Sequence, residues 1–160
     1  MRLLIAAVGK LKQGPERDLF AHYVERAETM GRKVGLTPVS VLEVPESRGP
    51  TPAARTAADG IAMLSRVPPN HKLVCLDPAG ETIDSEDFAR SVVQFRDRGA
   101  PGLAFLIGGA EGLASEAIAR ADLRLSLGRM TLPHGLARIV LAEQIYRAMT
   151  IVAGHPYHRG

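Results

Sequence analysis

LAFLIGGAEG, at residues 103–112, carries a strand and a glycine turn in direct succession. Its first five residues, Leu103–Ile107, are all apolar, which is typical of a strand buried on both faces. Glycines follow at positions 108, 109 and 112, and a short helix is expected from Ser115. A strand that leads through such a turn into a helix is the repeating unit of α/β proteins.

The same alternation extends outward in both directions. Further strands are expected at Arg2–Val8, Pro38–Val44, Lys72–Asp77 and along the alternating Leu123, Leu125 and Leu127. Helices are expected from Pro15 to Gly31, from Thr51 to the stop at Pro68-Pro69, from Asp84 or Ser85 to Gly99, and from Gly135 to Ala153. This order predicts an α/β fold with a mostly parallel sheet and helices on both faces. Without an internal repeat or a linker, residues 1–160 are expected to form a single domain.

Composition limits the class of protein. Hydrophobic residues make up 46% of the chain and charged residues 23%, so the chain can bury a core and is not disordered. No apolar run reaches the roughly 18–20 residues of a membrane span. The opening MRLLIAAVG is too short for the apolar region of a signal peptide, so we expect a cytoplasmic protein. The single cysteine, Cys75, lies between Val74 and Leu76 and is expected to be a buried structural thiol.

The basic residues are mostly arginine. Sixteen of the twenty are arginine, and the formal net charge is +3. Arginine binds phosphate in a planar, bidentate manner and stacks on bases. A GC-rich genome explains the same bias equally well, so composition alone leaves nucleic-acid binding open.

Three loops at strand ends carry the unusual chemistry. They cover residues 76–80, 107–112 and 128–134, and they converge on one pocket if their strands are neighbours, because ligands bind beyond the carboxyl ends of parallel strands. Ala110 replaces the second glycine of a dinucleotide-binding fingerprint, so the glycine turn is either a ligand cradle or a tight connection. Asp77 is favoured as a turn cap. The apolar loop 130–134 could wrap an aromatic ring.

The C-terminal part has two further features. The last helix is apolar around much of its circumference, which favours burial at a dimer interface over a core helix of a monomer. The tail reads His-Pro-Tyr-His-Arg at 155–159, a combination suited to stacking on a base and contacting phosphate rather than to fraying. A metal site is not expected, because His155 and His158 have no acidic ligand nearby.

Four segments together resemble a known family. They are LIGGAEG at 106–112, TLPH at 131–134, RIVLAEQIYRA at 138–148 and HPYHR at 155–159. With the opening strand and the chain length, they are similar to the SPOUT-class RNA methyltransferases. The nearest type is the small single-domain one that methylates N3 of a pseudouridine in large-subunit (23S) ribosomal RNA. The resemblance covers essentially the whole chain.

The resemblance implies a trefoil knot in the C-terminal part of the sheet, a homodimer, S-adenosylmethionine as cofactor and the assembled ribosome as substrate. The implied cofactor-binding residues are Leu76, Gly108, Leu127, Gly128, Arg129, Met130, Thr131, Leu132 and Pro133. The implied catalytic residues are Tyr157, His158 and Arg159, which would stack on the target base, accept the N3 proton and hold an anion or phosphate. Arg129 and Arg138 are second candidates for phosphate contact.

Other functions remain open from the residues alone. A member of the same family could act on a base or ribose of tRNA. A nucleotide-binding regulator without catalysis would also fit the loops. A flavodoxin-like flavin protein is disfavoured, because no phosphate-cradling loop is present.

Overall fold

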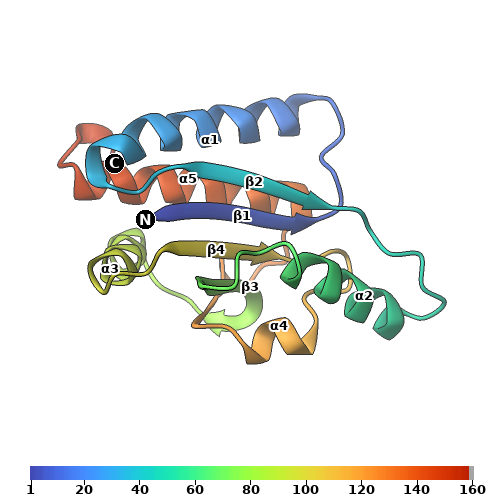
Figure 1. The fold of residues 1–160 in the computed structure, drawn as a ribbon. Helices are drawn as coiled ribbons and strands as arrows, with labels where there is room; N and C mark the ends of the chain where they lie inside the picture. Colours follow the sequence, from blue (N-terminus) through green and yellow to red (C-terminus); the bar gives the residue numbers. More distant parts are fainter. Residues whose placement is uncertain (159–160) are drawn as a thin grey trace.

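Five parallel strands form the central sheet of the computed structural model, which describes residues 1–158 (Figure 1). Their order across the sheet is β2-β1-β4-β3-β5, and every pair of hydrogen-bonded neighbours is parallel. The strands are β1 (Arg2–Val8), β2 (Val39–Val44), β3 (His71–Glu81), β4 (Gly102–Ile107) and β5 (Leu123–Leu125). The neighbours β4, β3 and β5 are the strands that lead into the three unusual loops.

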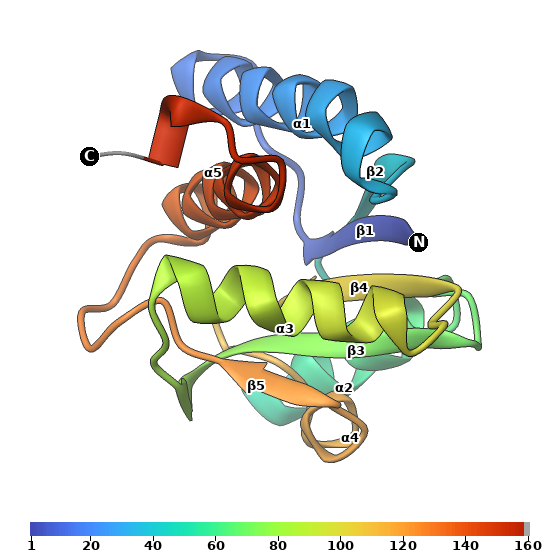
Figure 2. The same cartoon turned by 90° about the vertical axis from the view of Figure 1, so that its left-hand side faces the viewer.

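Helices cover both faces of this sheet. They are α1 (Pro15–Val34), α2 (Pro52–Leu64), α3 (Ser85–Asp97), α4 (Ser115–Ala119) and α5 (His134–Val152), followed by the 3-10 turn η1 (Pro156–His158). Helices α1, α3 and α5 pack on one face, and α2 and α4 pack on the other (Figure 2). The predicted α/β fold is confirmed. The trefoil knot stays a prediction.

Alternate residues of the strands feed two separate cores. In β1, Leu3 and Ile5 belong to the core under α1, α3 and α5, whereas Leu4 and Ala6 belong to the core under α2 and α4. Side chains of a strand point to opposite faces in turn, so a strand covered on both faces must be apolar throughout. This is why β1 and β4 read as unbroken apolar runs.

Helix α1 ends later than the sequence predicts. It continues past Gly31 to Val34, and Gly35 closes it in the left-handed conformation, with φ of 72° and its N–H bonded to the Gly31 carbonyl. A Cβ on Gly31 would collide with the Leu36 carbonyl oxygen. Gly31 therefore permits close packing inside the fold, and the helix-ending role belongs to Gly35.

Strands β3 and β5 also differ in length from the prediction. Strand β3 runs through the expected turn to Glu81, with a register shift between Leu76 and Glu81, and both residues pair with Leu125. Strand β5 ends at Leu125, so Leu127 belongs to the following loop. The turn after Asp77 is a bulge within a strand, which sequence alternation does not reveal.

Candidate active site

A cavity of about 910 Å³ lies at the carboxyl ends of β3, β4 and β5. The three loops singled out in the sequence meet here, as the order of the strands requires. All nine residues expected to bind the cofactor line the cavity: Leu76, Gly108, Leu127, Gly128, Arg129, Met130, Thr131, Leu132 and Pro133. That they bind a cofactor stays a prediction.

The glycine loop after β4 folds back on itself. The N–H of Gly112 donates to the Gly109 carbonyl over 3.0 Å, and Gly112 has a left-handed φ of 83°. A Cβ on Gly108 would collide with the carbonyl group of Gly112. The loop is therefore the tight connection that the sequence allowed, and it also presents its backbone along the cavity.

Helix α2 holds the glycine loop from outside. The Arg55 guanidinium lies 2.7 Å from a carboxylate oxygen of Glu111 and also donates to the Gly49 carbonyl over 3.2 Å. The Asp59 carboxylate accepts the Ser47 N–H over 2.7 Å. One face of α2 therefore connects the loop between β2 and α2 to the cavity wall.

Asp77 acts as the predicted turn cap at the cavity rim. Its carboxylate accepts the Ala79 N–H over 2.9 Å and two N–H groups of Arg124 over 2.9 and 2.6 Å. The Ala79 hydrogen bond and the Arg124 cation hold the pKa of Asp77 below its usual value. The hydrogen bonds of the Asp77 carboxylate are therefore made to groups that stabilise the local turn.

Cys75 is fully buried and donates its S–H to the Ala117 carbonyl over 3.3 Å. Burial raises the pKa of the thiol to about 11. A thiol held protonated in this way is a poor nucleophile. The interpretation of Cys75 as structural is confirmed.

The loop between β5 and α5, at the left of Figure 2, contributes lining residues to the cavity. Ser126 fastens its start, because the hydroxyl donates to the Gly128 carbonyl and accepts the Gly128 N–H. Beyond this turn Met130 is 84% exposed, whereas Leu132 is half-buried. An exposed apolar side chain at the rim of a cavity is suited to contact with a ligand.

Arg138 is a candidate phosphate-contact residue whose environment was predicted wrongly. It is 1% exposed, and its guanidinium donates to the Val8 carbonyl, to the Gly9 carbonyl over 2.9 Å and to Glu43 over 3.0 Å. Burial lowers its pKa, which the Glu43 carboxylate opposes. The expected phosphate contact is therefore wrong for Arg138, which ties α5 to the end of β1. Arg129 is exposed on the cavity loop.

Residues 155–157 of the tail do not line the cavity of their own chain. Tyr157 packs on α5, with its ring centroid 4.7 Å from that of Tyr146 and its hydroxyl donating to Glu143 over 3.2 Å. Burial and the neighbouring tyrosine and carboxylate raise the pKa of Tyr157 to about 12. The His158 side chain and Arg159 lie outside the described residues. Within one chain, Tyr157 and the nine expected cofactor-binding residues are thus apart.

Helix α5 is covered without a second chain. It packs against α1, α3 and η1, which bury residues around most of its circumference. Leu136 is an exception and is 42% exposed. The apolar pattern of α5 therefore does not by itself require a dimer, and the homodimer stays a prediction.

No helix in residues 1–158 combines the length and apolarity needed to span a membrane. Within the same range, no group of three or more His, Cys, Asp or Glu side chains is arranged to hold a metal ion.

Comparisons with known proteins agree with this arrangement. Residues 1–158 match the model of the family described as "Predicted SPOUT methyltransferase". "Ribosomal RNA large subunit methyltransferase H" of Xanthobacter autotrophicus is 50% identical over 159 residues, which cover 99% of this chain and 99% of that protein. The protein of the same name from Methylobacterium nodulans is 50% identical over 160 residues, covering 100% of this chain and 99% of the relative.

A solved structure supports the fold. The probable methylase family protein from Haemophilus influenzae superimposes with a TM-score of 0.51, covering 98% of this chain and 69% of that chain. Only 13% of the residues are identical, so this likeness concerns the fold alone.

Proposed function

The chain belongs to the SPOUT methyltransferase family, and we propose that it methylates N3 of a pseudouridine in large-subunit ribosomal RNA with S-adenosylmethionine as the methyl donor. Two relatives that match the whole chain at 50% identity are named as large-subunit ribosomal RNA methyltransferases. The observation that carries the proposal is the cavity beyond β3, β4 and β5, with all nine expected cofactor-binding residues along it.

The cavity suits the cofactor in size and in lining. Its volume of about 910 Å³ falls within the roughly 300–1,000 Å³ usual for small-molecule sites. The glycine loop lines the cavity with backbone groups, and Met130 and Leu132 line it with apolar side chains. When bound, S-adenosylmethionine would supply a methyl group already activated on a sulfonium. The residues of the chain then need to orient the acceptor and to exclude water.

The tail is assigned to the acceptor base. N3 of pseudouridine carries a proton that must leave, and positioning of reactants contributes roughly 7–11 kcal/mol in favourable cases. We assign Tyr157 to stacking on the base, His158 to accepting the proton and Arg159 to holding the anionic base or a phosphate. Because Tyr157 lies apart from the cavity of its own chain, the tail is assigned to the cavity of a second copy.

A homodimer would supply that second cavity. Leu19 on α1 is 44% exposed and Leu136 on α5 is 42% exposed, and these two helices pack together. Exposed apolar side chains on adjacent helices are suited to being covered by another chain. Sedimentation equilibrium is expected to find a dimer at micromolar concentration, and a stable monomer there would contradict the assignment.

The assembled ribosome is the proposed substrate, which makes the cytoplasm the site of action. A small domain of net charge +3 makes few phosphate contacts, so its binding to bare RNA is expected to be weak and strongly dependent on salt. A folded ribosomal surface would supply the missing recognition. Intact ribosomes or large subunits should therefore be methylated much faster than free transcript, and equal rates would argue against this substrate.

Two measurements test the reaction itself. Mass spectrometry of ribosomal RNA nucleosides from a deletion strain should lose one methylated pseudouridine, and an unchanged nucleoside profile would contradict the proposed substrate. Calorimetric titration should detect binding of S-adenosylhomocysteine but not of ATP or FMN. Binding of ATP or FMN alone would instead support the regulator or the flavin protein.

A further inference from the structure

All three tyrosines of the chain lie in one cluster beside η1. They are Tyr23 on α1, Tyr146 on α5 and Tyr157 in η1. The ring centroids of Tyr23 and Tyr146 are 6.5 Å apart, and those of Tyr146 and Tyr157 are 4.7 Å apart. Tyr157 therefore meets a prepared aromatic surface instead of fraying, although it is close to the end of the chain.

Arg26 is the residue of α1 that joins this surface to the tail. Its guanidinium donates to the Tyr146 hydroxyl over 2.7 Å. The guanidinium carbon lies 4.3 Å from the Tyr146 ring centroid and 5.1 Å from the Tyr157 ring centroid. One planar cation thus contacts both rings, which is a favourable cation–π arrangement for arginine.

Arg26 differs in its ionic partners from Arg147, the other arginine beside Tyr157. Arg147 lies 5.0 Å from the Tyr157 ring centroid, but its guanidinium is bound by the Glu143 carboxylate at 2.8 Å. The same carboxylate accepts the Tyr157 hydroxyl. Within residues 1–157, no carboxylate forms an ion pair with Arg26, so its polar partner is the neutral Tyr146 hydroxyl. Because Arg26 contacts both rings and binds one hydroxyl, it holds the two rings in a fixed relative orientation.

We propose that Arg26 is a positioning residue for methyl transfer: by holding Tyr146 and Tyr157 it fixes the direction in which the chain leaves η1. The inference rests on the proposed catalytic role of the tail. Arg26 itself touches neither the donor cavity nor, in this assignment, the reacting atoms. A small misplacement of reacting groups can cost about a hundredfold in rate, so loosening this anchor should act on turnover rather than on cofactor binding.

The test compares Arg26→Met with Arg26→Lys in the full-length protein, with ribosomes as substrate. Methionine keeps the apolar stem and removes the donors and the charge, whereas lysine keeps the charge. We expect Arg26→Met to lower kcat about tenfold or more while the affinity for S-adenosylhomocysteine stays within about twofold. Arg26→Lys should recover part of kcat.

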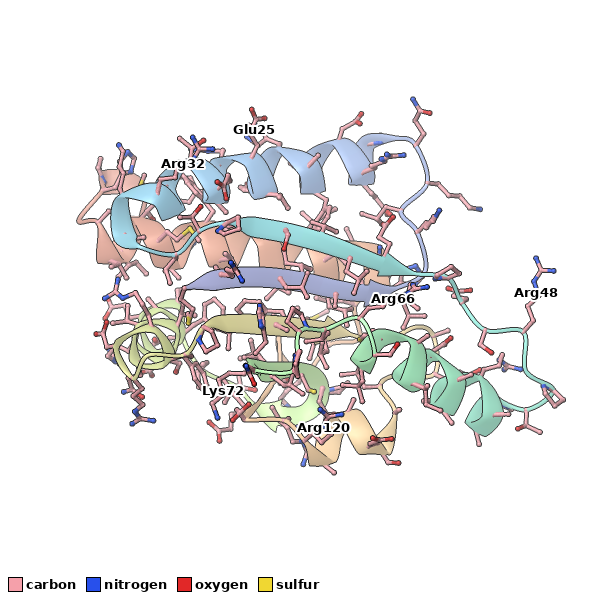
Figure 3. All side chains as sticks on the ribbon, in the orientation of Figure 1. Glu25, Arg32, Arg48, Arg66, Lys72 and Arg120 are labelled. Atoms are coloured by element: carbon pink, nitrogen blue, oxygen red, sulfur yellow. The ribbon has the colours of Figure 1, made fainter. Side chains whose placement is uncertain are left out.

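Tyrosine emission reports on the same anchor directly. The chain contains no tryptophan, so its emission arises from the three tyrosines of this cluster. Arg26→Met should make that emission more accessible to quenching by acrylamide. The matched control is Arg32→Met on the same helix (Figure 3), because the Arg32 side chain is 72% exposed and, within residues 1–157, forms its ion pair with Glu28 at 3.2 Å. The control should keep wild-type kcat and quenching.

Deletion of residues 156–160 distinguishes failure of this inference from failure of the proposed function. If the deletion leaves kcat unchanged, the proposed role of the tail is wrong. If the deletion abolishes turnover but Arg26→Met keeps full kcat, only the positioning role is wrong. The role is also overturned if Arg26→Met loses cofactor affinity, thermal stability or the dimer together with kcat, because Arg26 would then support the fold or the assembly.

Discussion

Gly108 has no space for even one methyl group. A Cβ there would collide with the Gly112 carbonyl, whereas a Cβ on Gly112 meets nothing within 4 Å and only strains a φ of 83°. Gly108→Ala should therefore open the glycine loop and abolish binding of S-adenosylhomocysteine in calorimetry. Gly112→Ala is the control. It should lower only the free energy of unfolding, by the roughly 1–2 kcal/mol that a left-handed conformation costs a residue with a Cβ. Equal affinities in the two variants would contradict this account of the loop.

Arg138 should be worth more to stability than its ion pair alone. Removal of one partner from a buried charge pair usually costs about 3–5 kcal/mol, and we expect Arg138→Met to lower the free energy of unfolding by that amount. Glu43→Gln should cost less, because the Glu43 side chain is 28% exposed. The double variant should not recover stability, since the Val8 and Gly9 carbonyls would still lack their donor. Denaturant titration measures all three, and full recovery in the double variant would refute the carbonyl contribution.

The sequence predicted where the loops lie in the fold better than it predicted which side chains surround a given residue. The order of elements predicted that three loops would meet at one cavity if their strands were neighbours, and the family resemblance implied the nine residues that line it. The burial of Arg138 depends on Val8 and Glu43, which are 130 and 95 residues away along the chain. No local pattern encodes such partners, so a surface role was expected for a cation that the fold encloses.

At the scale of elements, α2 is expected to hold the glycine loop of the cavity in place through the Arg55 side chain. Arg55→Gln breaks the contact with Glu111 and weakens the one with Gly49. Because the pair is partly exposed, the free energy of unfolding should change by less than about 1 kcal/mol. The loosened glycine loop should instead raise the KM for S-adenosylmethionine severalfold with kcat little changed.

Arg120→Gln, at the C-terminal cap of α4, is the matched control for that experiment (Figure 3). The Arg120 guanidinium also lies beside a carboxylate, that of Glu116 at 3.9 Å, but Arg120 does not line the cavity. Equal KM values in wild type and in both variants would show that α2 does not support the cavity.

Element ends were the least predictable part of the fold. Glycine ends helices, but Gly31 and Gly35 both satisfy that pattern, and only the packing of Gly31 against Leu36 and Met149 decides between them. Similarly, the bulge that extends β3 depends on pairing with β5, which lies far along the chain. Tertiary contacts therefore set the boundaries, whereas local periodicity predicted each element's existence and type.

At the scale of the whole molecule, α5 separates the two halves of the proposed site. The cavity reaches its first residues, His134 and Ala137, whereas Tyr157 packs beside Glu143 and Arg147. The six-residue step from Ala137 to Glu143 corresponds to roughly 9 Å along the helix axis. In the proposed assignment, one chain presents a donor cavity and an acceptor tail at different places along α5, and a second chain would bring the two together.

This separation makes a complementation experiment decisive. A protein lacking residues 156–160 retains its cavity but has no tail, and a Gly108→Val protein retains its tail but has a disrupted cavity. Each should be inactive alone. In a heterodimer, one of the two composite sites combines the intact cavity of the first chain with the intact tail of the second, so mixing after subunit exchange should restore methyl transfer to at most about half of the wild-type rate per dimer. Native mass spectrometry of differently tagged chains verifies the exchange. A mixture that contains heterodimers yet stays inactive would refute the shared site, whereas activity of the Gly108→Val protein alone would refute the assignment of the donor cavity.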